Sequence, residues 1–183
     1  MVTTDNERGK LQTYEIAYTF GLYPLQQYMV KFPKGKVQVL DIAWDSRSKS
    51  DGGQRWFHLH PEDNVIAGDV LHWTGSNLNW NFMCADCHST NLRKNYNPKT
   101  KSLNTKYDNI TLTCASCHGN GDEHLAWAKN PKGFAGKNRF GLLIDLKKNR
   151  WSIDEHGKAK LDGNIDRTEV MMCAQCHSRR AQI

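Results

Sequence analysis

The pattern Cys-x-x-Cys-His occurs three times in this chain of 183 residues, and no other feature constrains its fold as strongly. The cysteines are Cys84 and Cys87, Cys114 and Cys117, and Cys173 and Cys176, and the histidines are His88, His118 and His177. This pattern is the attachment signature of c-type haem. Thiols at i and i+3 face the same side of a helical turn, so each can bond one vinyl group while the adjacent histidine reaches the iron. The sequence therefore predicts three haem c groups.

Two other uses of paired cysteines fit this pattern less well. Zinc sites use Cys-x-x-Cys pairs, but they do not require a histidine directly after every pair. Redox-active dithiols favour a βαβ setting of the thioredoxin type, which the sequence does not suggest. The three motifs use all six cysteines, so none remains for a disulfide bond.

The composition predicts a fold built around the haems. Only 38% of the residues are hydrophobic, which gives a thin side-chain core for this length. We therefore predict one domain, residues 1–183, of the α+β class with much irregular structure. Its parts are an N-terminal β-hairpin at about 14–44 and a haem-binding part at about 52–183, with short helices carrying the motifs.

Local patterns place the elements along the chain. Residues 14–43 alternate in polarity around a turn at Pro33–Lys36, which predicts a hairpin that covers a haem or pairs with another chain. Helices are expected at 79–87, 123–129 and 168–179. A strand is expected at 110–113, and loops are expected at 45–55 and 131–141.

The histidine count indicates the chemistry of the irons. Eight histidines are present, so five remain after the three motifs are satisfied. We predict His58, His72 and His124 as the distal ligands, because each is next to aromatic or apolar residues. His60 and His156 are the alternatives, and a methionine ligand is a further one, although Met more often packs in a core. An iron held by two histidines has no open position, which favours electron transfer over catalysis.

Charge and targeting signals narrow the environment. The formal net charge is +6, but the propionates of three haems would add up to six negative charges, so the Lys and Arg residues are expected to pair with them. No nucleic-acid recognition motif accompanies the charge. Attachment of c-type haem outside the cytoplasmic membrane predicts export, to the periplasm or beyond. Residues 1–10 cannot form a signal peptide and no segment has transmembrane length, so we expect a trimmed portion of a longer precursor.

Several runs resemble a family of exported bacterial multihaem cytochromes c. This family is related to the tetrahaem electron carriers of nitrifiers and is often fused to tetratricopeptide repeats. The similar runs are Tyr18–Pro33, Gly52–His60, Asp69–Tyr96, Thr113–Ala128 and Cys173–Ile183. His58, His72 and His124 fall within runs that the family shares, whereas an aromatic residue is more usual at His60. The chain also resembles trihaem subunits that polymerise into extracellular cytochrome filaments.

These observations predict electron transfer through three bis-histidine haems in an exported, extracellular protein that polymerises into a conductive filament. The expected partners are redox proteins or extracellular acceptors and further copies of the chain, with no nucleic acid. The alternative is a haem-dependent oxidoreductase acting on a small nitrogen compound, which requires one iron with an open position.

Overall fold

The computed structural model describes residues 1–178, which form two compact units. The N-terminal unit comprises Met1–Ala85 and Arg93–Lys106, and the C-terminal unit comprises Asp86–Leu92 and the chain from Tyr107 onward. The boundary falls inside the first Cys-x-x-Cys-His motif. The single domain expected from the sequence stays a prediction.

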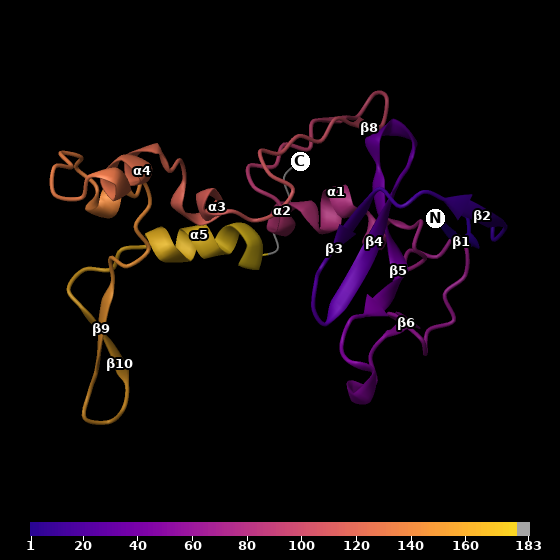
Figure 1. Cartoon of the computed structure of the whole chain (residues 1–183), viewed down its shortest axis with the longest axis horizontal. Helices are drawn as coiled ribbons and strands as arrows, with labels where there is room; N and C mark the ends of the chain where they lie inside the picture. Colours follow the sequence, from indigo (N-terminus) through magenta and orange to yellow (C-terminus); the bar gives the residue numbers. More distant parts are fainter. Residues whose placement is uncertain (179–183) are drawn as a thin grey trace. The chain divides into compact units, whose positions relative to one another are not determined.

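The N-terminal unit is built on a four-stranded antiparallel sheet (Figure 1). Its strands, in spatial order, are β3 (Tyr18–Phe20), β4 (Leu25–Lys31), β5 (Val37–Asp45) and β6 (Arg55–His58). The β4–β5 pair confirms the hairpin predicted around Pro33–Lys36, where the short 3-10 helix η1 (Pro33–Gly35) makes the turn. A second hairpin, β1 (Val2–Asp5) and β2 (Leu11–Tyr14), was not expected from the sequence.

The core of the N-terminal unit lies around Trp73, whose side chain is 0% exposed. It packs with the buried side chains of Val30 and Leu40. The rings of Tyr14 and Phe32 meet the indole edge to face, with centroids 4.9 and 5.6 Å away. Aromatic pairs in this geometry attract beyond their buried area. A tryptophan from a loop therefore joins the hairpins into one unit.

Asn81 connects the first motif's helix to the sheet. Asn79 is the N-cap of the helix α1 (Trp80–Met83), and its side chain accepts a hydrogen bond from the Phe82 N–H. The side-chain oxygen of Asn81 accepts a hydrogen bond from the Val37 N–H at 2.8 Å. The side-chain nitrogen of Asn81 donates to the Gly35 carbonyl and the Thr105 hydroxyl. A buried amide that is satisfied in this way fixes the orientation of the helix directly before Cys84.

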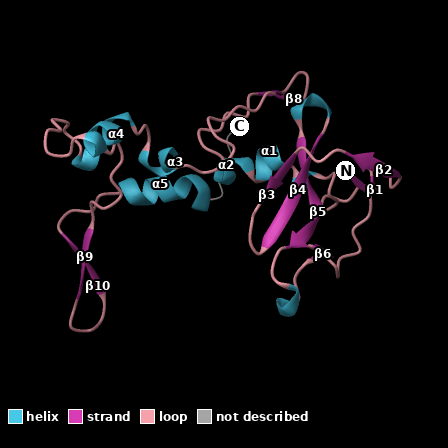
Figure 2. Ribbon diagram, viewed as in Figure 1, coloured by secondary structure: helices cyan, strands magenta, loops and turns pink. Residues whose placement is uncertain are grey.

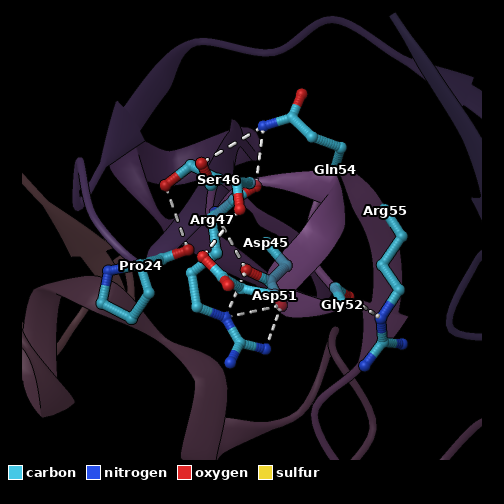
Figure 3. Close-up of polar contacts among 9 residues, drawn as sticks. Pro24, Asp45, Ser46, Arg47, Asp51, Gly52, Gln54 and Arg55 are labelled. Atoms are coloured by element: carbon cyan, nitrogen blue, oxygen red, sulfur yellow. Dashed lines mark hydrogen bonds and ion pairs between the residues drawn. The ribbon is translucent and has the colours of Figure 1, made fainter.

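The remaining elements of the N-terminal unit are short. They are η2 (Lys49–Asp51), η3 (Ser76–Leu78), β7 (Tyr96–Asn97) and β8 (Ser102–Leu103). As expected, residues 46–54 connect β5 to β6 as a loop. Figure 3 shows how this loop is held: the Arg47 guanidinium binds both carboxylate oxygens of Asp45, and the Gln54 amide donates to the Ser46 and Arg47 carbonyls.

The Asp45–Arg47 pair predicts an acid-sensitive loop. The hydrogen bonds from Arg47 lower the pKa of Asp45 from 3.8 to about 2. Because the folded-state pKa is the lower one, the pair's stabilisation is complete above pH 3.8 and is lost as the pH falls towards about 2. We expect Asp45→Asn to remove part of the pH dependence of the unfolding midpoint in this window. Arg47→Gln should have the same effect, and an unchanged acid transition in both variants would contradict the prediction.

The C-terminal unit contains short helices and one hairpin, joined by long loops (Figure 2). Its elements are the last part of α2 (Ala85–His88), α3 (Cys114–His118), α4 (Asp122–Lys129), η4 (Arg139–Gly141), β9 (Arg150–Ile153), β10 (Ala159–Asp162) and α5 (Thr168–His177). The helices predicted at 123–129 and 168–179 are confirmed as α4 and α5, although Arg179 lies outside the described residues. None of the side chains of α3, α4 and α5 is buried.

The strand predicted at 110–113 is wrong. Residues 110–113 form neither a strand nor a helix, and the preceding Asn109 makes an isolated bridge with Thr90. The Thr90 hydroxyl donates to the Thr111 carbonyl at 2.8 Å and accepts from the Thr113 N–H at 3.0 Å. A side-chain hydroxyl thus satisfies backbone groups that a strand partner would have taken.

Among residues 1–178, the structure contains no helix both long and apolar enough to cross a bilayer.

Candidate haem-binding site

The second motif occupies one complete helical turn, α3. The Thr113 side chain and Ser116 form a capping box at its start, which satisfies N–H groups that the first turn leaves unpaired. Gly119, with φ +72°, ends the helix directly after His118. An added Cβ at Gly119 would lie 2.9 Å from Leu143, so a side chain there would be crowded as well as strained. The capping residues Thr113 and Gly119 therefore set the start and the end of this helical turn.

The other two motifs are also on helical backbone. Cys84 ends α1, and α2 carries Cys87 and His88. The third motif forms the second half of α5, which ends at His177. All six cysteines lie in the described part of the chain, where no disulfide bond joins them.

The structure brings together the second cysteine of each motif within the C-terminal unit. The Cys87 thiol lies 3.8 Å from the Cys176 carbonyl oxygen, and the Cys176 thiol lies 3.9 Å from the Asp86 carbonyl oxygen. Burial raises the pKa of the Cys176 thiol, and the nearby thiols of Cys87 and Cys117 raise it further. Cys87 and Cys176, which are far apart in the sequence, are therefore close in space, and Cys117 is near enough to affect the Cys176 thiol.

The imidazole rings of His118 and His124 make the hydrogen bond through Nδ1 that is typical of metal-binding histidines. The Nδ1 of His118 donates to the Ile144 carbonyl at 2.9 Å, and the Nδ1 of His124 donates to the Phe140 carbonyl at 2.7 Å. A carbonyl oxygen can only accept, so the ring proton must be on Nδ1 in both residues. This tautomer leaves the Nε2 lone pair available, and it is the arrangement that orients metal-binding histidines.

His58 is at the end of β6 and has a half-exposed side chain. Its Nε2 lies 3.8 Å from an Asp41 carboxylate oxygen, too far for a hydrogen bond. His60, also half exposed, lies 3.5 Å from the Asp63 carboxylate. β6 ends at His58, so His60 lies beyond the strand. Of these two, only His58 is supported by a strand.

His72 differs from the other predicted ligands because the protein itself occupies both of its ring nitrogens. Its side chain is 3% exposed, with Nε2 at 2.9 Å from the Asp5 carboxylate and Nδ1 at 2.7 Å from the Thr74 hydroxyl. A carboxylate accepts the Nε2 proton, so the lone pair needed for iron is absent there. Ligation by His72 would require release of Asp5.

We expect Asp5→Ala to lower the free energy of unfolding by about 1–3 kcal/mol, because the buried His72 Nε2 loses its partner. Denaturant unfolding at neutral pH would measure this, with the strand neighbour Thr3→Ala as the control, since Thr3 bonds only to the exposed Thr13 hydroxyl. An Asp5→Ala protein of unchanged stability would mean that the bond is not made in solution and that His72 is free to reach iron.

The other alternative ligands, His156 and the methionines, are less suitably placed to bind iron. His156 is 75% exposed in the turn between β9 and β10, beside Glu155. Among the methionines, Met29 is buried in the sheet, with 2% exposure, which matches the packing role that is commoner for this residue. Met171 is exposed on α5.

Taken as a donor set, the residues present fit covalent c-type haem. Each pair of thiols is spaced by one helical turn and is followed by an imidazole, and two imidazoles, His118 and His124, carry an available Nε2. Bound there, haem would supply one-electron chemistry at iron. The protein's part would be to hold the ring by thioether bonds and to orient the imidazoles by the carbonyls of Phe140 and Ile144.

Residues 48–119 match the cytochrome c554 and c-prime family. This segment contains the first two motifs together with His58 and His72, and the match indicates covalently bound c-type haem. The third motif and His124 lie outside it.

Among solved structures, the chain is similar to the crystal structure of outer cell wall cytochrome OcwA, with a TM-score of 0.40 and 23% identity. That similarity covers 84% of this chain and 23% of the cytochrome's length. No match was found among the curated proteins.

Sequence reasoning missed the residues that support the ligands. Phe140 and Ile144 act through backbone carbonyls, which every residue has, so their side chains carry no signal. Asp5 was missed because it is 67 residues from His72, whereas Thr74 is only two residues from His72 and could have been found locally. The glycine at position 141, next to Phe140, was the one local sign of a specialised turn.

Proposed function

We propose that this protein transfers electrons through three covalently attached c-type haems. The observation that carries the proposal is the triple motif, whose second cysteines Cys87, Cys117 and Cys176 gather within one unit. Haems attached at neighbouring points lie close enough for electrons to pass between them. The family match supports haem c at the first two motifs, and the third has the same residues at the same spacing.

The exposure of the helices in the C-terminal unit supports the same proposal. Helices α3, α4 and α5 bury none of their side chains. A unit of this kind needs another source of apolar burial to be stable. Three haem rings supply large apolar surfaces at the attachment points, so the cofactors would serve as its core.

In this proposal His88, His118 and His177 are the proximal ligands, and His58, His124 and, once Asp5 releases it, His72 are the distal ones. Of the three distal residues, His124 is the one best oriented to bind iron, because its Nδ1 already donates to a carbonyl and leaves Nε2 available. His58 is half exposed, and its Nε2 makes no hydrogen bond to the nearby Asp41 carboxylate, which is 3.8 Å away. With two imidazoles on each iron, no position is open for a reactant.

One observation favours a second candidate, a haem enzyme for a small nitrogen compound. The bond from His72 to Asp5 takes up one of the three distal ligands. If that bond persists in the loaded protein and no other residue replaces His72, one iron keeps an open position, as catalytic metal sites do.

The absorption and electron paramagnetic resonance spectra of the purified, haem-loaded protein test both candidates. Electron transfer predicts three haems per chain, all low spin, with no response to cyanide or nitrite. A high-spin haem that binds cyanide and turns over nitrite or hydroxylamine would reject it in favour of the enzyme.

We further propose that the protein is exported, acts outside the cell and assembles into a filament. The exposed strands of the β9–β10 hairpin, which include Trp151 and Ile153, offer apolar surface for contact between copies. Electron microscopy of native material would distinguish a filament from a monomeric carrier.

A further inference from the structure

We propose that Arg139–Asp145 form one positioning loop that holds His118 and His124 for two different haem irons. The inference rests on the proposed function, since it assumes that both histidines bind iron. Its basis is that two carbonyls of one short loop, those of Phe140 and Ile144, receive the Nδ1 protons of both imidazoles. His124 lies only six residues after His118, too close in sequence to cap the opposite face of the same haem.

An ion pair closes the positioning loop at its two ends. Arg139 Nε lies 2.6 Å from Asp145 Oδ2, and Arg139 Nη2 lies 2.9 Å from Asp145 Oδ1, a two-point geometry that resists twisting. The same guanidinium carbon lies 4.8 Å from the centre of the Phe140 ring. Phe140 and Gly141, at φ +55° and +67°, turn the chain between these ends.

The loop is attached to both histidine-bearing helices. The Ile144 N–H donates to the His118 backbone carbonyl, so His118 and Ile144 are joined by two hydrogen bonds. On the other side Gly141 is packed against α4: an added Cβ would lie 2.4 Å from the Glu123 carbonyl oxygen and 2.8 Å from the His124 nitrogen. The Phe140 ring also contacts Trp127, which stacks on the His124 ring.

Because one loop holds both imidazoles, it would influence the reduction potentials of both irons. A hydrogen bond from Nδ1 to a carbonyl makes an imidazole a stronger donor to iron and fixes its orientation. Stronger donation favours the ferric state, so loss of the bond raises the reduction potential. Because both bonds come from one loop, a displacement of the loop affects a proximal ligand and a distal ligand together.

The test compares two glycine substitutions with the same backbone strain. Gly141→Ala strains a positive φ and pushes the positioning loop away from α4. Gly157→Ala, in the β9–β10 turn at φ +76°, strains the backbone with no atom within 4 Å of the new Cβ. In the haem-loaded protein we expect Gly141→Ala to let cyanide displace a distal ligand, which the wild-type protein does not allow. Gly157→Ala should behave as the wild type.

A second pair of variants covers the case in which Gly141→Ala does not fold. Arg139→Gln opens the positioning loop, and Arg47→Gln breaks a similar Arg–Asp pair in the N-terminal unit. We expect Arg139→Gln alone to raise the reduction potential of two haems and to speed the solvent exchange of two imidazole Nδ1 protons, as seen by NMR. The double exchange Arg139→Asp, Asp145→Arg should restore both quantities.

The possible failures are distinguishable. A wild-type protein with fewer than three haems, or with high-spin iron, rejects the proposed function before any variant is compared. On a low-spin, three-haem background, equal cyanide binding and equal potentials in the loop variants and their controls reject the positioning loop alone.

Discussion

Replacing Cys173 and Cys176 together with serine is expected to remove one haem from the protein. Attachment needs both thiols and the following histidine, and serine has no thiol to bond the haem. The change should lower the mass of the denatured protein by one haem and its haem absorbance by one third if the chain carries three haems. Because these two cysteines lie on α5, away from the segment of the family match, this variant tests the third haem directly.

The control lies inside the same motif. Gln175 is exposed between the two cysteines, and its side-chain amide donates to the Met172 sulfur, so Gln175→Ala should keep every haem. Intact mass spectrometry of both variants decides the question. A wild-type mass that already corresponds to two haems, unchanged in the double serine variant, would mean that the third motif is not used.

Trp73→Ala is expected to destabilise the N-terminal unit by about 3–5 kcal/mol, the range for truncating a buried aromatic side chain. The substitution removes a side chain with no exposed surface, its edge-to-face contacts with Tyr14 and Phe32, and the indole hydrogen bond to the Asp5 carbonyl at 2.7 Å. A loss of this size is comparable to the whole stability of many small domains. Unfolding followed by far-ultraviolet circular dichroism would measure it.

Trp56→Ala is the matched control in the same unit. Its side chain is 54% exposed and meets only the rings of Tyr28 and Trp44 at the surface of the sheet. We expect a loss of about 1 kcal/mol or less. Equal losses in the two variants would show that Trp73 is not the centre of this core.

Local patterns predicted the elements whose cause is local. The turn after Phe32 contains Pro33 and Gly35, and it produced the expected β4–β5 hairpin. The helix α5 begins at Thr168, where the sequence placed a helix start. The strand expected at 110–113 failed because the hydroxyl of Thr90, 20 or more residues earlier, binds that backbone instead. Such a competitor cannot be read from the segment itself.

The predictions of distal ligands likewise depend on contacts that the neighbouring sequence does not show. His124 was chosen for its neighbours, and the structure provides it with a carbonyl partner. His72 was chosen for the same reason, yet it is buried against Asp5, and nothing near residue 72 in the sequence reveals that contact. The two cases look alike in sequence because a histidine flanked by apolar residues is compatible with either role.

The sequence by itself determined the chemistry of attachment, because a Cys-x-x-Cys-His motif needs only five consecutive residues and one turn of helix. It also determined how many imidazoles are available. Only the tertiary structure decided which imidazoles present an available nitrogen, since that depends on acceptors brought in from distant segments. A hydrogen-bond acceptor such as the Phe140 carbonyl belongs to the backbone, and its direction is set by folding and not by residue type.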